Sequence, residues 1–304
     1  MTGDPAPDAA PPPADEDVSP SDAATRTVPL TDVIGLSALA ATVTLNFAPF
    51  LFWMWERWMK SEYYGHGVLV LPIAGYLVWR RREALAALPK AADGLGLVLV
   101  VVGLMLHLLA AQVTVNFLSG FALLPILLGL ALWLWGRRVA LALLFPIAYL
   151  AFMVPVDRLL VDAFSSPLQL LAAKVATAFG RGIGMPVTRE GVNISLPEYT
   201  FEVAIACSGL KSLISMSALA ALFAYLLEGR LWRRALIVLA VLPVALVANA
   251  ARITTILLIA QSLGEKAATG FFHGASGIIV FLFGLLALLG IARLTGCHRL
   301  RDDI

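Results

Sequence analysis

Residues 235–260 read ALIVLAVLPVALVANAARITTILLIA and contain one charged residue, Arg252. An apolar run of this length predicts a transmembrane α-helix, because a hydrocarbon core of about 30 Å needs about 20 helical residues. A charge inside such a run costs about 2.5–3.5 kcal/mol at the bilayer centre, so Arg252 is a candidate functional residue. The alternative is an arginine that extends its guanidinium to the lipid headgroups.

The rest of the chain has the same apolar character. Hydrophobic residues make up 60% of it and charged residues 14%, against about 45–50% and about 25% in soluble domains. This composition excludes a soluble globular domain and predicts an all-α, multi-pass membrane protein. About eight transmembrane helices are expected, over residues 31–52, 67–80, 93–112, 116–135, 139–154, 208–227, 235–260 and 271–292.

The membrane domain is assigned to residues 30–293, with a tail at each end. Residues 1–29 are rich in proline and acidic residues, with Arg26 as the one basic residue. Such a segment cannot bury a core, so a disordered tail is predicted. It lacks the basic start of a cleaved signal peptide, so the first span is expected to be retained. Residues 294–304 form a short second tail.

Basic residues follow the even-numbered spans, whereas the short loops 113–115 and 261–270 carry no net charge. By the positive-inside rule, both termini lie in the cytoplasm and the odd-numbered spans exit outside the cytoplasmic (inner) membrane. The basic residues are Arg80, Arg81, Arg82 and Lys90 after the second span, Arg137 and Arg138 after the fourth, Arg230, Arg233 and Arg234 after the sixth, and Arg293, Arg299 and Arg301 after the eighth.

This topology places three candidate catalytic residues at one membrane face. At about 1.5 Å per residue, the helix from Ala235 to Arg252 crosses about 26 Å, so Arg252 approaches the outer surface. Cys207 precedes the sixth span on that side, and His273 begins the eighth span, which enters from it. A cysteine, an arginine and a histidine at one depth have the chemistry of a nucleophile, an oxyanion stabiliser and a general acid or base.

The surroundings of Cys207 favour its reactive thiolate form. Ser208 begins a predicted helix, whose N-terminus carries partial positive charge, and Lys211 follows one turn later. The alternative is an inert thiol, because buried free cysteines often pack as small hydrophobic residues. The other cysteine, Cys297, follows the last span at the opposite face. This topology therefore excludes a disulfide between the two.

The segment 155–207 is expected to form the substrate side of the site, outside the membrane. Residues 157–179 mix apolar and charged side chains, which is typical of an interfacial amphipathic helix. The β-prone stretches that follow predict a small β-hairpin that leads into the sixth span. These stretches are residues 187–188, 192–195 and 199–203.

The loop between the first two spans is rich in aromatic residues. They are typical of an interface belt, which anchors a protein at the lipid headgroups. His66 follows them between two glycines and either lines the site or belongs to a turn. The aromatic residues are Trp53, Trp55, Trp58, Tyr63 and Tyr64.

Three separated motifs resemble the exosortase/archaeosortase family. Residues 202–213 read EVAIACSGLKSL, residues 249–253 read NAARI, and His273 is followed by Gly277. The earlier YGHG at 64–67 and YLVW at 76–79 resemble the amino-terminal half of that family. The likeness covers about residues 55–292, and the ordered cysteine, arginine and histidine are its most specific element.

The resemblance implies a membrane-embedded cysteine transpeptidase or protease. Its expected partners are exported proteins with a carboxy-terminal sorting tail, which has a Pro-Glu-Pro-like signal, a transmembrane helix and a basic cluster. Cys207 would form a thioester, Arg252 would stabilise the oxyanion or hold the substrate, and His273 would move the proton. No metal or organic cofactor is implied. Substrate contacts are expected from Asn249, Lys211, Ser208 and His66, although many relatives have arginine where Lys211 stands.

A different class of function remains open. A transporter or assembly partner for exopolysaccharide export would use Arg252 and His66 to line a pathway. That class predicts inverted repeats or broken helices in matching halves, and no convincing repeat is visible in the sequence. A membrane protease with two catalytic aspartates is excluded, because no apolar span contains a suitable pair.

Overall fold

The computed structural model describes residues 30–61, 63–197, 200–203, 208–264, 271–297 and 299–301. The side chains of 30–43, 158–159 and 271–276 are outside this description. The predicted tail 1–29 and Cys207 therefore lie outside the described residues, and His273 is described by its backbone alone. The chain divides into two units, 1–48 and 49–304, and every contact reported below lies within the second.

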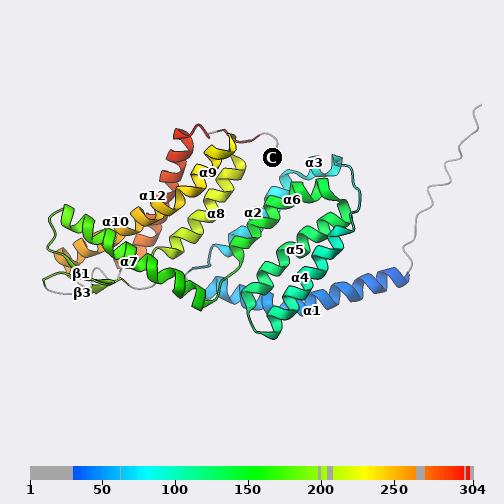
Figure 1. Cartoon of the computed structure of the whole chain (residues 1–304), viewed down its shortest axis with the longest axis horizontal. Coiled ribbons are helices and arrows are strands. Elements are labelled where there is room, and N and C mark those ends of the chain that lie inside the picture. Colours follow the sequence, from blue (N-terminus) through cyan, green and yellow to red (C-terminus); the bar gives the residue numbers. More distant parts are fainter. Residues whose placement is uncertain are drawn as a thin grey trace, which may run out of the picture. The chain divides into compact units, whose positions relative to one another are not determined.

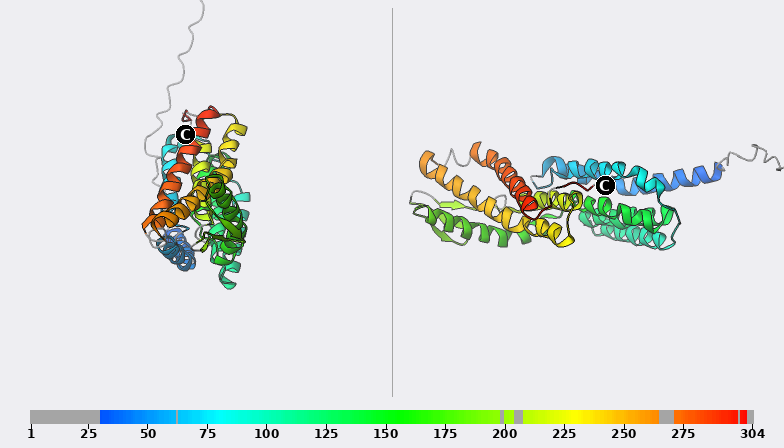
Figure 2. Two further views of the ribbon diagram at one scale, coloured as in Figure 1. Left: turned by 90° about the vertical axis from the view of Figure 1, so that its left-hand side faces the viewer. Right: turned by 90° about the horizontal axis from the view of Figure 1, so that it is seen from above.

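The described chain is mostly helical, as the composition predicts, and a small sheet lies in the connection between α7 and α8 (Figures 1 and 2). The helices are α1 (Leu30–Lys60), α2 (Gly67–Arg80), α3 (Arg82–Ala87), α4 (Leu95–Gln112), α5 (Asn116–Trp135), α6 (Arg137–Tyr149), the 3₁₀ turn η2 (Leu150–Met153), α7 (Arg158–Gly182), α8 (Leu210–Leu226), α9 (Leu231–Leu239), α10 (Val241–Leu263) and α12 (Phe271–Leu294).

Among the described residues, four stretches are long and apolar enough to cross a membrane. They are 95–112, 116–135, 231–263 and 277–294, and two shorter apolar helices, α2 and α8, accompany them. The predicted number of eight spans is therefore not confirmed. α6 has 13 residues and continues as a 3₁₀ turn where a fifth span was expected.

The predicted span 235–260 is divided between α9 and α10 at Ala240. Pro243 explains the break, because proline has no N–H to donate to the carbonyl of Leu239 four residues earlier. The helix resumes at once, since the Val244 N–H donates to the Ala240 carbonyl at 3.0 Å. Pro243 thus separates α9 from α10, and the chain continues as a helix through Arg252.

Helices α4 and α5 approach each other through glycine. A Cβ at Gly96 would lie 2.5 Å from the Gly129 carbonyl oxygen, and one at Gly129 would lie 2.6 Å from the Gly96 carbonyl oxygen. Only residues without a side chain permit this separation, which is a packing mode typical of membrane helices.

Long-range hydrogen bonds join the helix ends that the alternating topology predicts to share a face. Trp58 Nε1 donates to the Met153 carbonyl at 2.8 Å, which joins α1 to η2. At the opposite end, the Arg301 N–H donates to the Leu226 carbonyl at 2.9 Å, which joins the carboxy-terminal segment to α8. The candidate site lies at the Trp58 end.

The segment that was expected outside the membrane, 155–207, contains three strands in its described part, where a two-stranded hairpin was predicted. β1 (Thr188–Glu190), β2 (Asn193–Ser195) and β3 (Thr200–Glu202) form an antiparallel sheet in the order β1-β2-β3. Each of the three β-prone stretches in the sequence contributes a strand, so the predicted hairpin lacked one strand of the sheet. The amphipathic helix expected at 157–179 is α7.

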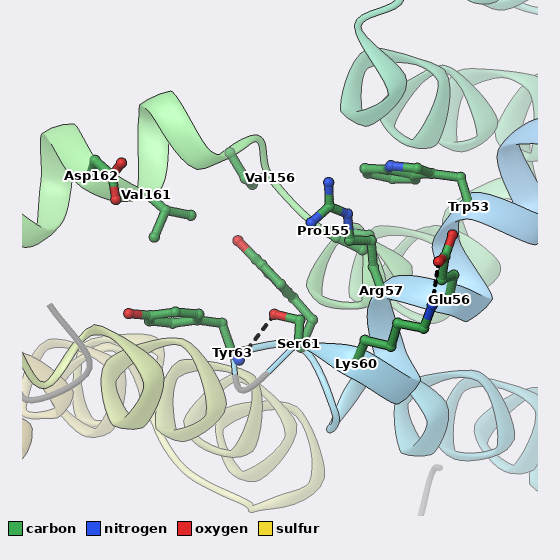
Figure 3. Close-up of a pocket in the computed structure, with 11 residues that line it drawn as sticks. Trp53, Glu56, Arg57, Lys60, Ser61, Tyr63, Pro155, Val156, Val161 and Asp162 are labelled. Atoms are coloured by element: carbon green, nitrogen blue, oxygen red, sulfur yellow. Dashed lines mark hydrogen bonds and ion pairs between the residues drawn. The ribbon is translucent and has the colours of Figure 1, made fainter.

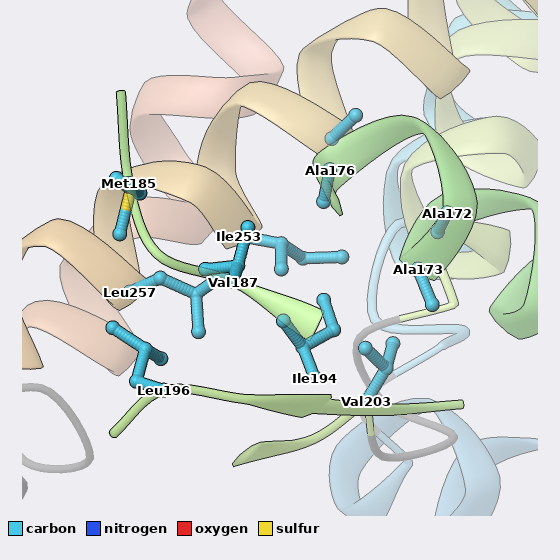
Figure 4. Packing of buried hydrophobic residues seen from close by; sticks show 11 residues of the cluster. Ala172, Ala173, Ala176, Met185, Val187, Ile194, Leu196, Val203, Ile253 and Leu257 are labelled. Carbon is cyan, nitrogen blue, oxygen red and sulfur yellow. The ribbon is translucent and has the colours of Figure 1, made fainter. Parts of the chain in front are cut away.

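Side chains from the sheet, α7 and α10 share one apolar core (Figure 4). Ile194 and Val203 are fully buried there against Ala173 of α7 and Ile253 of α10. Burial at about 25 cal/mol per Å² of apolar surface holds the sheet on these helices. Val203, the last described residue before 204–207, is thereby fixed beside α10.

Candidate functional site

A cavity of about 700 Å³ lies where the ends of several helices meet, and we call it the central cavity. Its walls come from the end of α1, the α1–α2 turn, the first turns of α8, the middle of α10 and α12. Three residues that the sequence singled out, His66, Lys211 and Arg252, line it together. They are separated by up to 186 positions (66 to 252) in the chain.

Arg252 is partly buried in the wall that α10 contributes. Gly277 and Phe281 of α12 also line the cavity. In the sequence of α12, position 273 lies four residues, about one helical turn, before Gly277. The cavity therefore adjoins the backbone position of the predicted general acid or base.

The N-terminus of α8 is held by a close contact with α10. Gly209, the residue before α8, has a φ of +84°, and a Cβ there would lie 3.2 Å from Asn249 side-chain atoms. Asn249 is 1% exposed and packs against this turn. Ser208 is also buried, and its Oγ accepts a hydrogen bond from the Leu210 N–H at 3.3 Å. Asn249 and Ser208 are thus placed behind the cavity wall, where they position α8.

Gly209 also lines a second, almost entirely apolar cavity of about 210 Å³ on the other side of this turn. Ser208 belongs to that cavity, together with leucines of α7, α8 and α10. The turn that follows Cys207 therefore separates a polar compartment from an apolar one.

Lys211 is exposed in the first turn of α8. Ser215, one turn later, donates its hydroxyl to the Lys211 carbonyl at 3.0 Å, and both residues line the central cavity. A lysine there supplies one positive charge without the planar, bidentate geometry of arginine.

His66 precedes α2 and is half-buried in the central cavity. Its Nε2 lies 3.2 Å from the carbonyl oxygen of Phe152. Burial lowers the pKa of His66, and the hydrogen bonds to Phe152 and Tyr63 partly oppose that effect. A neutral imidazole is therefore favoured near pH 7.

Trp58 and its surroundings were not predicted to belong to the site. Trp58 and Tyr64 are buried, whereas an interface belt would expose both. A Cβ at Gly67 would lie 2.2 Å from Trp58 Nε1, so the glycine of the YGHG motif makes room for the indole. The sequence offered one signal for this contact. Gly67 follows Trp58 closely in the chain, and a buried tryptophan needs an acceptor for its indole N–H.

Comparison with protein families identifies a family that the chain matches over most of its length. A family model described as transmembrane exosortase covers residues 55–290. All residues that line the central cavity fall within this range, as do positions 207 and 273. Neither the curated proteins nor the solved structures yield a match.

Proposed function

Because the chain belongs to the transmembrane exosortase family, we propose that this multi-pass membrane protein is a cysteine transpeptidase or protease. Its substrates are exported proteins, whose carboxy-terminal sorting tail it cleaves at the outer face of the cytoplasmic membrane. The observation that carries the proposal is the central cavity, which brings Arg252, Lys211 and His66 to the helix N-terminus immediately after Cys207.

The proposed reaction begins with attack of the Cys207 thiolate on the scissile carbonyl carbon. The partial positive charge of the α8 N-terminus and the Lys211 ammonium both favour the thiolate. The carbonyl π electrons move to oxygen, and the Arg252 guanidinium stabilises the resulting oxyanion. Collapse of this intermediate breaks the C–N bond and leaves a thioester.

His273 completes the proton transfers. The imidazolium donates a proton to the departing amine, and the neutral imidazole then accepts one from the incoming nucleophile. That nucleophile is an acceptor amine or hydroxyl in transpeptidation, or water in hydrolysis. Its attack on the thioester forms the product and returns the Cys207 thiolate.

His66 contributes a neutral hydrogen-bonding group to the same cavity. Because the Phe152 carbonyl engages Nε2 and burial disfavours the imidazolium, His66 orients a polar substrate group and does not form an ion pair. Lys211 remains the cation that attracts the substrate at the α8 side.

Cleavage of a cognate tail in cells tests this function. Cys207→Ala is expected to abolish the shift in mobility that accompanies cleavage, at unchanged protein level. Cys297→Ala is the matched control, because Cys297 is buried next to Gly229 at the opposite end of the second unit. Continued cleavage by Cys207→Ala would reject the proposal, and a tolerated Cys207→Ser under a transport assay would favour an export partner.

A further inference from the structure

A mostly apolar cavity of about 330 Å³ lies at the end of α2 that is remote from His66, and we call it the basal cavity. Its walls come from the last turn of α2, from α3, from the α3–α4 connection, from the end of α5 and from α6. Val139 and Leu143 line it and are buried in a cluster of α5 and α6 side chains, against which Val78 and Leu85 pack. The interior of the cavity is therefore apolar and is held by packing.

The basal cavity lies at the end of a candidate membrane span. Trp135 lines the cavity and is the last residue of α5, which is long and apolar enough to cross a membrane. Trp79, in the last turn of α2, also lines the cavity, and both tryptophans are exposed. Exposed tryptophans at the ends of spans are typical of the lipid headgroup region. The mouth of the cavity is thus expected to face headgroups, in the leaflet that the basic loops assign to the cytoplasm.

The described residues that line the basal cavity include two cations, Arg82 and Lys90, and no acidic residue. The acidic residues nearest to them in the sequence are each paired with an arginine. Glu83 lies 3.1 Å from Arg82, and Asp93 lies 2.6 Å from Arg137. Both side chains of the Glu83 pair are exposed, so this pair compensates Arg82 only weakly. The lining of the cavity therefore keeps a positive charge.

Arg82 is held on the aromatic wall of the cavity. Its guanidinium lies 4.6 Å from the centre of the Trp79 ring, and its Nη1 donates to the Trp79 carbonyl oxygen at 3.2 Å. A guanidinium has five N–H donors. In the described part of the chain, one of them is donated to Trp79 and one to Glu83. Arg82 can therefore bind a phosphate group while it stays on Trp79.

We propose that the basal cavity binds one anionic phospholipid. The phosphate diester pairs with Arg82 and Lys90, and part of one acyl chain lies in the interior against Val139 and Leu143. An apolar interior alone would accept any lipid, and two cations alone would accept any small anion. Together they match a molecule in which an anion is joined to a hydrocarbon chain. The assignment does not depend on the cysteine chemistry.

The binding test uses full-length protein in dodecyl maltoside micelles and measures bound lipid by native mass spectrometry. Dioleoyl phosphatidylglycerol is the anionic probe, and dioleoyl phosphatidylcholine is the zwitterionic probe with the same chains. Arg82→Gln and Lys90→Gln are each expected to weaken binding of phosphatidylglycerol about fivefold, as for one basic residue near an anionic headgroup. Binding of phosphatidylcholine should stay within about twofold in both variants.

Two further variants control for the loss of charge. Arg138→Gln is the matched control, because Arg138 is exposed in the first turn of α6 but does not line the basal cavity. Lys60→Gln is the second control, because Lys60 lines a different cavity at the end of α1 and pairs there with Glu56 at 2.6 Å (Figure 3). Both should leave binding of phosphatidylglycerol within about twofold.

The apolar interior is tested without any change in charge. Ala86 lines the basal cavity from an exposed position of α3, so Ala86→Phe should fill the cavity in a protein that still folds. It is expected to weaken binding of phosphatidylglycerol at least about tenfold, since exclusion of about two methylene groups suffices for that loss. Ala84→Phe is the matched control, because Ala84 is exposed on the same helix outside the cavity, and it should bind within about twofold of wild type.

Several results would overturn the assignment. Normal binding by Arg82→Gln and Lys90→Gln would remove the headgroup contact, and normal binding by Ala86→Phe would remove the acyl-chain contact. An equal loss with Arg138→Gln, or equal losses for the two lipids, would show attraction to the basic surface without a defined site. Displacement of phosphatidylglycerol by glycerol 3-phosphate, which has the phosphate without the chains, would identify an anion site instead. Size-exclusion profiles of all variants verify that they are folded.

Discussion

Replacing Gly209 by alanine tests how the first turn of α8 is held beside the central cavity. Gly209 has a φ of +84°, and this left-handed conformation costs a residue with a Cβ about 1–2 kcal/mol. The new Cβ would also lie 3.2 Å from the Cβ, Cγ and Nδ2 of Asn249. We expect the free energy of unfolding to fall by at least about 1–2 kcal/mol.

The larger expected effect is on catalysis. Asn249 is almost fully buried, so the crowding is relieved by displacement of the Ser208–Leu210 turn. That turn directly follows Cys207 in the chain. A displacement of about 1 Å at reacting groups costs on the order of 10²-fold in rate, so we expect tail cleavage per folded molecule to fall by about that factor.

Gly184→Ala is the matched control. Gly184 has the same φ of +84°, but a Cβ at this position would meet no atom within 4 Å. The variant should lose a similar 1–2 kcal/mol, about the cost of the backbone conformation, and keep its cleavage rate. Thermal unfolding of purified protein and cleavage normalised to protein level measure the two effects. Normal cleavage by Gly209→Ala would refute the inferred link between this turn and the catalytic residue.

Three further predictions concern other parts of the site. Arg252→Lys is expected to slow cleavage by about 10²–10³-fold at unchanged protein level, as for loss of an oxyanion donor; a wild-type rate would remove Arg252 from catalysis. Because burial lowers the pKa of His66, the unfolded state binds its proton more readily, and stability should fall as the pH drops below about 6.5. His66→Gln should fall less over that range, and parallel melting curves would contradict this. Gly67→Ala, whose Cβ would meet the Trp58 indole at 2.2 Å, should destabilise the protein by about 1–3 kcal/mol in thermal melts, whereas Gly75→Ala, with open space around it, should not.

The shared position of Arg252, Lys211 and His66 could be anticipated from the sequence. Helix rise and alternating loop charge assign each residue a depth, and both are local properties of the chain. Arg252 and Lys211 do line one cavity. The roles that the resemblance gives Cys207 and His273 remain predictions, since Cys207 and the His273 side chain lie outside the described residues.

Contacts between distant segments could not be anticipated. Trp58 lies in an aromatic-rich stretch that reads as a membrane anchor, yet its indole donates to Met153, 95 positions away. Asn249 lies one turn before Arg252 and reads as a second cavity residue, but it packs against Gly209. Such pairs depend on how helices are rotated against each other, which a periodicity common to all apolar helices does not specify.

Detection of a covalent intermediate on Cys207 tests the central claim most directly. Full-length protein is incubated with a cognate substrate, quenched in acid and digested for mass spectrometry. The account predicts a substrate fragment attached to the peptide that contains Cys207, released by hydroxylamine as a thioester and absent from Cys207→Ala. Cleavage without an adduct in Cys207→Ala, or an adduct on another residue, would contradict it.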